Sequence, residues 1–376
     1  QHVVSGSSAA VAPGLLGVVA EAIGEPSLPM ALLSSIGDVD SADANYALWN
    51  LSRMVHNDAD LSAAFDAGLN DGLFRIHSPF TGAWNEFIVE FGSRGPDEWD
   101  LRSPTWETHP QLLLAALDRV RLQSDAESPH ERHREKAGQR DALITKARIA
   151  LADKPEVAPL LDLGLGAGKM MAHRERTKTS IVRVLHEARV AFRELGRRHG
   201  HDELIFQVLD SELDDYIVNP SSFTNKLTQR YNEWRELFDL EPPFIIADAT
   251  VAPLSQWARK DAQVVKVAQA GEMLSGVAGS PGIARGIARV VLDPGDPGDL
   301  EPGDILVAPC TDPSWTPLFM TSAAVVVNVG GQISHAVIVS RELGVPCVVS
   351  ITDGTQRIPN GAMIEVNGTT GVVTIL

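Results

Sequence analysis

His335 occupies a position where a histidine could act as a nucleophile. A buried-looking apolar run ends at Asn328, Gly330 and Gly331 predict a turn, and Ser334 is a residue type that caps helix N-termini. A helix N-terminus presents free N–H groups and a partial positive charge, which favour a bound phosphoryl group. Near pH 7 an exposed imidazole is largely neutral, so His335 could carry phosphate as a phosphoramidate. A capping or core histidine explains the position alone equally well.

Arg174 and Lys178 form a second group that could bind phosphate. They are four residues apart in a predicted helix from about Met170 to His199, so their side chains share one face. Two aligned cations could hold a phosphoryl group between a donor and an acceptor. The alternative is a solvated, charged helix end. Further along the helix, apolar residues follow the spacing of a packed face: Ile181, Val184, Leu185, Ala188, Phe192 and Leu195.

The remaining pattern predicts a helical part followed by an α/β part. Helical periodicity dominates to about residue 250, with further candidate helices at 41–55, 83–91, 110–122, 130–151 and 222–238. Signals weaken over 251–275, the expected hinge, although Leu254 to Ala270 could still be helical. Short β runs with Gly, Pro and Asp turns follow at 288–292, 305–308, 324–328, 347–350, 363–366 and 372–376. We therefore expect a mainly helical domain at 1–250 and a compact α/β domain at 276–376.

Composition excludes some classes of function. A formal net charge of -17 argues against a nucleic-acid partner. No signal peptide is visible, and we expect no membrane-spanning run. Cys310 and Cys347 suit core thiols in a reduced cytoplasmic protein. His130 and His133 lack the spacing of a zinc motif, and Gly164–Lys169 lacks the Walker A pattern, so neither a metal site nor a nucleotide loop is expected there.

The segment GGQISHAVIVSRELGVP, from Gly330 to Pro346, resembles the phosphohistidine signature of PEP-utilising enzymes. Segments 279–291 and 302–319 are similar to the opening and the middle of the same domain. Val337 and Ser340 replace alanines that are common in that family. The resemblance implies that residues 276–376 form a swivelling domain, with phosphate carried on His335 and with Gly330, Gly331 and Ser334 in its loop.

A looser resemblance covers much of the first 240 residues. The motif Phe91-Gly92-Ser93-Arg94-Gly95-Pro96, with later landmarks up to Trp106, is similar to the acceptor region of rifampin phosphotransferases. The stretch from Arg174 to Lys178 and the residues up to Leu213 are similar to the same region. That family has an ATP-binding domain, a largely helical acceptor domain and a terminal swivelling domain. The resemblance implies that Arg174 and Lys178 lie at the acceptor site, at the start of their helix.

Together these resemblances imply a phosphotransferase that works in two half-reactions. His335 would accept a phosphoryl group from ATP, and after a domain movement would deliver it to a hydroxyl of a small organic acceptor such as a rifamycin or a phenol. No ATP-grasp signature is visible. ATP and Mg²⁺ are therefore expected on an ATP-grasp domain upstream or on a separate subunit, with neither bound tightly by this chain.

Two other functions stay open. A non-catalytic phosphocarrier or regulatory module would use His335 but would need no acceptor cavity near Arg174 and Lys178. A PEP-synthase-like enzyme would need a barrel domain for pyruvate after the swivelling domain. The sequence ends at Leu376 without such a domain, which favours a hydroxyl acceptor bound by the helical part.

Overall fold

The computed structural model of the 376-residue chain describes residues 2–68, 78–242, 246, 250–260 and 265–376. The chain divides into two compact units. Unit 1 contains Gln1–Glu98, Ser103–Val182 and Val267–Leu376, and unit 2 contains Trp99–Arg102 and Arg183–Lys266. The domain limits expected from the sequence, 1–250, 251–275 and 276–376, stay a prediction.

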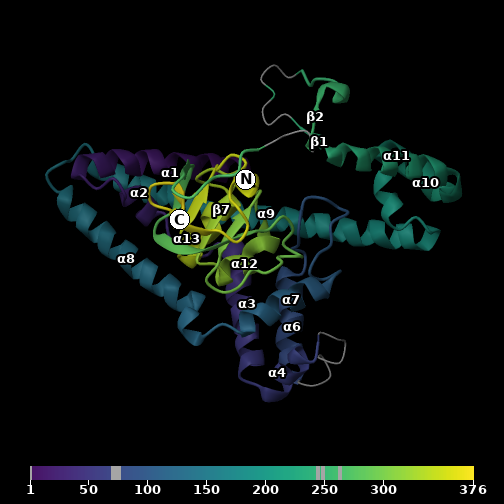
Figure 1. Cartoon of the computed structure of the whole chain (residues 1–376), viewed down its shortest axis with the longest axis horizontal. Coiled ribbons are helices and arrows are strands. Elements are labelled where there is room, and N and C mark those ends of the chain that lie inside the picture. Colours follow the sequence, from purple (N-terminus) through teal and green to yellow (C-terminus); the bar gives the residue numbers. More distant parts are fainter. Residues whose placement is uncertain (1, 69–77, 243–245, 247–249, 261–264) are drawn as a thin grey trace. The chain divides into compact units, whose positions relative to one another are not determined.

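The N-terminal part is helical, as predicted (Figure 1). Before the long helix α9, the described helices are α1 (His2–Ile23), α2 (Leu28–Leu32), α3 (Asp40–His56), α4 (Ala59–Asp66), α6 (Ser78–Phe91), α7 (Pro110–Arg121) and α8 (Pro129–Ala150). The predicted helices at 41–55, 83–91, 110–122 and 130–151 correspond to α3, α6, α7 and α8. Large apolar and aromatic side chains of α3, α4, α6 and α7 share one core.

Helix α1 corrects the expectation that no apolar run has membrane-spanning length. Its segment Val3–Ile23 is long and apolar enough to cross a membrane. The core helix of a soluble protein and a signal sequence near the N-terminus pass the same test. Here 33% of the apolar window is buried, including Leu16 and Val19, which lie against α2, α8 and α9. The length of this segment is therefore weak evidence for a membrane span.

Helix α9 (Ala158–His199) begins well before the predicted start at Met170. Three glycines hid this segment from helical prediction, because glycine disfavours helices. Two of them permit close packing: a Cβ at Gly164 would lie 2.7 Å from a side-chain atom of Leu16, and one at Gly168 would lie 2.6 Å from Leu33. The segment 164–169 is thus helix interior and forms no phosphate loop.

The predicted apolar face of α9 is only partly correct. Ile181 and Val184 are 41% and 70% exposed. The buried side of this stretch instead carries Val182 and two polar residues, His186 and Arg189. A buried polar face cannot be recognised from apolar spacing, which explains the error.

The C-terminal part is an α/β domain, as predicted. Its strands form one mixed sheet of eight strands, two more than the β runs that the sequence predicted. The strands are β3 (Met273–Ser275), β4 (Val277–Ser280), β5 (Ile283–Val290), β6 (Ile305–Ala308), β7 (Ala324–Val327), β8 (Cys347–Val349), β9 (Met363–Asn367) and β10 (Val372–Ile375). Their order is β3-β10-β9-β5-β6-β7-β8-β4. Neighbours from β5 to β8 are parallel, and the other pairs are antiparallel.

The sheet is covered on both faces. Alternate residues of β6 and β7 point to opposite sides: Leu306 and Val325 join the core of the helical part, while Ile305 and Val326 join a second core. Helices α12 (Thr316–Thr321) and α13 (His335–Leu343) lie on the first face and contact α3 (Figure 1). Because β6 and β7 are parallel, the loops that follow them emerge at the same edge of the sheet. Helix α14 (Gly354–Arg357) follows β8.

Unit 2 contains the end of α9, α10 (Leu213–Val218), α11 (Thr224–Glu236) and the short strands β1 (Leu240–Glu241) and β2 (Ala258–Arg259). Its small core holds Tyr216, whose hydroxyl lies 2.9 Å from Nδ1 of His201. The predicted helix at 222–238 is present as α11 flanked by 3₁₀ turns. The helix considered for Leu254 to Ala270 is absent from the described residues, which hold a 3₁₀ turn at Leu254–Gln256 and β2; residues 261–264 lie outside them.

Candidate functional site: a histidine beside three cations

His335 is the first residue of α13, as predicted. The turn before it is tight at Gly330, because a Cβ there would lie 2.9 Å from Oγ of Ser334 and 3.2 Å from Cβ of Val349. A Cβ at Gly331 would meet no atom within 4 Å, so the turn does not require a glycine there for space. Ser334 occupies the N-cap position, but its hydroxyl makes no capping hydrogen bond and is buried without a partner. Gly344 ends α13 in the left-handed conformation (φ 68°), as expected.

The ring of His335 is held by the loop that follows β6. The hydroxyl oxygen of Thr311 lies 3.1 Å from Nδ1, and that of Thr316 lies 3.4 Å from Nε2. The Thr316 hydroxyl donates to the carbonyl of Pro313 at 2.8 Å. Phe319 contacts the imidazole edge-on. Both ring nitrogens thus face hydroxyl groups, which fixes the orientation of the nucleophile.

Arg174 and Lys178 lie beside the His335 loop in unit 1. The guanidinium of Arg174 donates to the carbonyl of Ile333 at 3.2 Å and pairs with Glu175 at 2.9 Å. Lys178 Nζ lies 2.7 Å from a carboxylate oxygen of Glu98. The two cations belong to the middle of α9, so their predicted place at the start of a helix is wrong.

Arg94 is a third cation at this site, and we did not predict it as a site residue. Its guanidinium contacts the second carboxylate oxygen of Glu98 at 3.4 Å and donates to the hydroxyl of Thr179 at 2.6 Å. Its only sequence signal was its place in the motif 91–96. We name Arg94, Glu98, Arg174, Glu175, Lys178 and His335 the His335 cluster. With His335 neutral, the cluster holds one more positive than negative charge.

The surroundings of His335 favour its neutral form. Its side chain is partly exposed, yet enough protein surrounds the ring that burial is the main cause holding the pKa of His335 well below its usual value. The positive charges of Lys178, Arg94 and Arg174 lower that pKa further. A neutral imidazole at pH 7 keeps a lone pair available for attack on phosphorus.

The other groups that the sequence singled out have structural contacts. His130 stacks on Tyr46, and Nδ1 of His133 lies 3.6 Å from the carboxylate of Glu342. Among the residues the structure describes, no three His, Cys, Asp or Glu side chains gather as a metal site would require. Both cysteines are free; Cys347 is buried, as expected, but Cys310 is exposed and is no core thiol.

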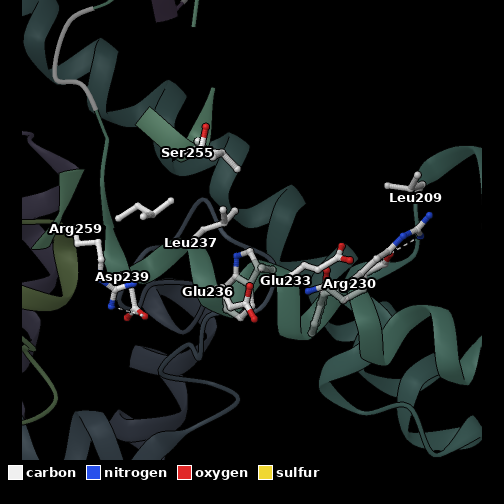
Figure 2. A pocket seen from close by; sticks show the side chains of 13 residues that line it. Leu209, Arg230, Glu233, Glu236, Leu237, Asp239, Ser255 and Arg259 are labelled. Carbon is white, nitrogen blue, oxygen red and sulfur yellow. Dashed lines mark hydrogen bonds and ion pairs between the residues drawn. The ribbon is translucent and has the colours of Figure 1, made fainter. Parts of the chain in front are cut away.

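Unit 2 has a pocket of its own with a volume of about 1010 Å³. Figure 2 shows Arg230, Glu233 and Glu236 of α11 on one part of its lining, and Ser255 and Arg259 on another. The ring of Trp234 and several leucines supply apolar surface. On unit 2 the guanidinium of Arg102 also stacks on Trp234, 3.6 Å from the ring centre.

Two family models match the chain. Residues 300–371 match the PEP-utilising enzyme mobile domain, and residues 1–175 match the rifampicin phosphotransferase fourth domain. The chain therefore has the mobile domain of PEP-utilising enzymes, which confirms the resemblance read from its histidine motif. Within that class it is similar to rifampicin phosphotransferases.

Curated relatives support the same conclusion. The chain is 30% identical to rifampicin phosphotransferase of Streptomyces sviceus over 77% of its own length and 34% of that protein. It is 27% identical to a second rifampicin phosphotransferase, from a Streptomyces species, over 95% of its length and 42% of that protein. It is 30% identical to the prodigiosin synthesizing transferase PigC of Serratia marcescens over 78% of its length and 33% of that protein. The chain thus spans only about a third to two fifths of these relatives.

Proposed function

We propose that this chain is the acceptor-binding and phosphoryl-carrying part of a phosphotransferase. Phospho-His335 would pass a phosphoryl group from ATP to a hydroxyl of a small organic acceptor, such as a rifamycin or a phenol. The observation that carries the proposal is the position of His335 beside Arg174, Lys178 and Arg94, on one compact unit. The two family models and the relatives named rifampicin phosphotransferase support it.

Each half-reaction exchanges one bond to phosphorus for another. In loading, a neutral ring nitrogen of His335 attacks a phosphorus of ATP, the N–P bond forms, and the P–O bond to the leaving nucleotide or phosphate breaks. In delivery, the acceptor oxygen attacks, the O–P bond forms, and the N–P bond breaks. The ring nitrogen that is released takes up the hydroxyl proton. Cations beside the phosphorus stabilise the charge shared among nitrogen, phosphoryl oxygens and acceptor oxygen.

ATP and Mg²⁺ enter this proposal on an ATP-grasp domain, either upstream or on a separate subunit. Mg²⁺ there would neutralise charge on the phosphate oxygens. The glycine-rich segment of this chain fits neither ligand, because 164–169 lies inside α9. A hinge at 251–275 would let the domain at 276–376 alternate between the nucleotide and the acceptor. We propose the cytoplasm as the site of action.

A phosphocarrier without catalysis is the second candidate. It needs only His335 and the loop that orients the ring. The half-buried cations Arg174 and Lys178 of α9 and the buried Arg94 favour the enzyme over the carrier, because withdrawing charges from water costs free energy that a carrier alone would not require.

The test mixes the chain with ATP, Mg²⁺, the ATP-binding part of a rifampicin phosphotransferase, and a panel of rifamycins and phenols. Mass spectrometry then looks for a phosphorylated product and for phosphate on the protein. The proposal predicts both. A chain that is phosphorylated on His335 but transfers to no compound would be a phosphocarrier, and a chain that is never phosphorylated would contradict both candidates.

A further inference from the structure

We propose that Arg94 is a third residue that binds the transferred phosphoryl group, and that Glu98 is the shared carboxylate that holds Arg94 and Lys178 until that group arrives. This inference rests on the proposed function and adds two residues to its site. Arg94 and Glu98 belong to the segment that follows α6, whereas Lys178 belongs to α9.

Arg94 is buried to an unusual degree for a cation. The residue is 1% exposed, and its backbone is fixed by hydrogen bonds to Phe91 and Trp106. Its guanidinium donates to Thr179, the residue directly after Lys178 on α9. The arginine is thus locked in place against the same turn of helix that carries a predicted phosphate-binding residue. A fixed donor loses little entropy when a ligand binds.

Arg94 has a longer contact with a carboxylate than Arg121, another buried arginine, has. Arg121 is also buried, and it contacts two carboxylates at short range, Asp66 at 2.6 Å and Asp118 at 2.7 Å. Arg94 instead contacts Glu98 at 3.4 Å, and the same carboxylate lies closer to Lys178, at 2.7 Å. Burying a cation is costly unless an anion compensates it. A transient anion at this place would supply the missing charge.

The segment around Arg94 is tied to the loop that holds the nucleophile. The N–H of Asp97 donates to the carboxylate of Asp312 at 2.9 Å. Asp312 directly follows Thr311, whose hydroxyl contacts Nδ1 of His335. The positive charge of Arg94 also acts on the His335 ring, because it is one of the causes that lower the pKa of His335. A phosphoryl group on His335 would therefore enter the field of Arg94.

Glu98 gives the site a way to change partners. Its carboxylate is fully buried and is shared by Arg94 and Lys178. Glu175, in contrast, pairs with Arg174. A phosphoryl group on His335 brings negative charge that competes with Glu98 for Lys178 and Arg94. Before loading, Glu98 keeps both cations positioned. After loading, the negative charge of the phosphoryl group compensates part of the positive charge of Arg94 and Lys178 in place of Glu98.

The experiment uses the full chain, loaded on His335 with phosphoramidate as the chemical donor and freed from excess donor. In loading, the ring nitrogen attacks phosphorus and ammonia leaves. A ³¹P NMR titration then gives the pKa of the phosphoryl group with no acceptor present. Cations lower that pKa, so Arg94→Gln should raise it by about 1. Glu98→Gln should lower it, because a competing negative charge is removed while an oxygen remains to accept from Lys178.

Arg121→Lys is the matched control, a buried arginine outside the cluster, and it should leave the phosphoryl pKa as in the parent chain. The expected shifts of the phosphoryl pKa have opposite signs for Arg94→Gln and Glu98→Gln. These signs distinguish a loss of charge from a disturbance of the fold, because loosened packing would move the pKa in the same direction in both variants. A parent-like titration of Arg94→Gln overturns the role of Arg94, and a raised pKa in Glu98→Gln overturns that of Glu98. A parent chain that takes up no phosphoryl group on His335 contradicts the proposed function itself.

Discussion

Arg94, Glu98 and Glu175 of the His335 cluster are buried, whereas most charged side chains around the pocket of unit 2 are exposed. The side chains of Arg94 and Glu98 are 2% and 0% exposed, whereas those of Arg259 and Asp239 at the pocket are 56% and 62% exposed. Water and salt screen the exposed pair, so its charges exert little force on a ligand. The charges of Lys178, Arg94 and Arg174 act on His335, since they lower its pKa. The cluster is therefore suited to moving a phosphoryl group, and the pocket offers mainly shape and apolar surface.

The two regions also differ in their nucleophiles. His335 stands at the edge of the sheet with both ring nitrogens oriented by threonines. The described lining of the pocket contains no histidine and no cysteine. We therefore place the chemistry at the cluster.

The largest expected effect comes from His335→Ala, which should abolish uptake of acid-labile phosphate from phosphoramidate. His173→Ala is the matched control, because His173 is an exposed histidine on α9 beside Arg174. Radiolabel on the protein after gel filtration measures the uptake. If His335→Ala took up as much label as the parent, another residue would be the phosphate carrier. The His335 cluster would then not differ from the pocket of unit 2 in holding the nucleophile.

Lys178→Ala should slow delivery from phospho-His335 to an acceptor by roughly a hundredfold, since losing one such contact costs about 3 kcal/mol in the barrier. Loading by ATP on its own domain should hardly change, because that step takes place at another site. Arg176→Ala, an exposed cation on the same helix, is the control. Rapid-quench single turnovers measure delivery. Equal rates for Lys178→Ala and the parent would leave Lys178 without a role in transfer.

These two predictions rest on residues that the sequence made visible. The glycines, the serine and the histidine lie within residues 330–335, and the β runs around them are apolar, so local rules predicted the turn and the helix. The role of His335 came from the resemblance to PEP-utilising enzymes. The position of Arg174 beside Lys178 also follows from helical spacing. Strands β3 and β4 were not predicted; Gly276 and Gly279 interrupt them, and each allows a close approach to β8.

The sequence could not assign Arg94 and Glu98 to the site. Their contacts with Lys178 and Thr179 join residues about eighty positions apart, which only tertiary packing brings together. The same reason explains the error on the part of α9 that belongs to unit 2, whose buried side carries His186 and Arg189. Buried polar contacts leave no periodic apolar pattern in the sequence.

The pH dependence of stability should reveal the neutral state of His335. The folded-state pKa of His335 lies well below its usual value, mainly because of burial. As pH falls below about 6.5, the unfolded chain binds a proton that the folded chain does not, so the free energy of unfolding should decrease. Above that pH the histidine should contribute no such dependence. Denaturant titrations between pH 8 and 5 measure the effect, and His335→Gln should lose less stability than the parent over the acid half of that range. If the free energy of unfolding of His335→Gln and that of the parent changed identically with pH, the folded-state pKa of His335 would not be lowered.

The smallest expected effect on the chemistry comes from the pocket of unit 2. Trp234→Ala should leave uptake of phosphate on His335 unchanged and should destabilise unit 2 by about 1 kcal/mol, since it removes the stacking with Arg102. Thermal unfolding and the radiolabel assay measure the two quantities. Loss of uptake in a folded Trp234→Ala variant would mean that the pocket takes part in the chemistry that we assign to the cluster.

Transfer of phosphate from His335 to an acceptor can be followed directly in a chase of labelled phosphate. The full chain is loaded with labelled phosphoramidate, freed from donor and mixed with rifampicin or with hydroquinone. The label on the protein, on the organic compound and in free phosphate is then followed over time. We expect that label leaves His335 and appears on a hydroxyl of one compound at the same rate, faster than it leaves the protein alone. Label that leaves His335 only as free phosphate, at the same rate with and without either compound, would contradict this expectation.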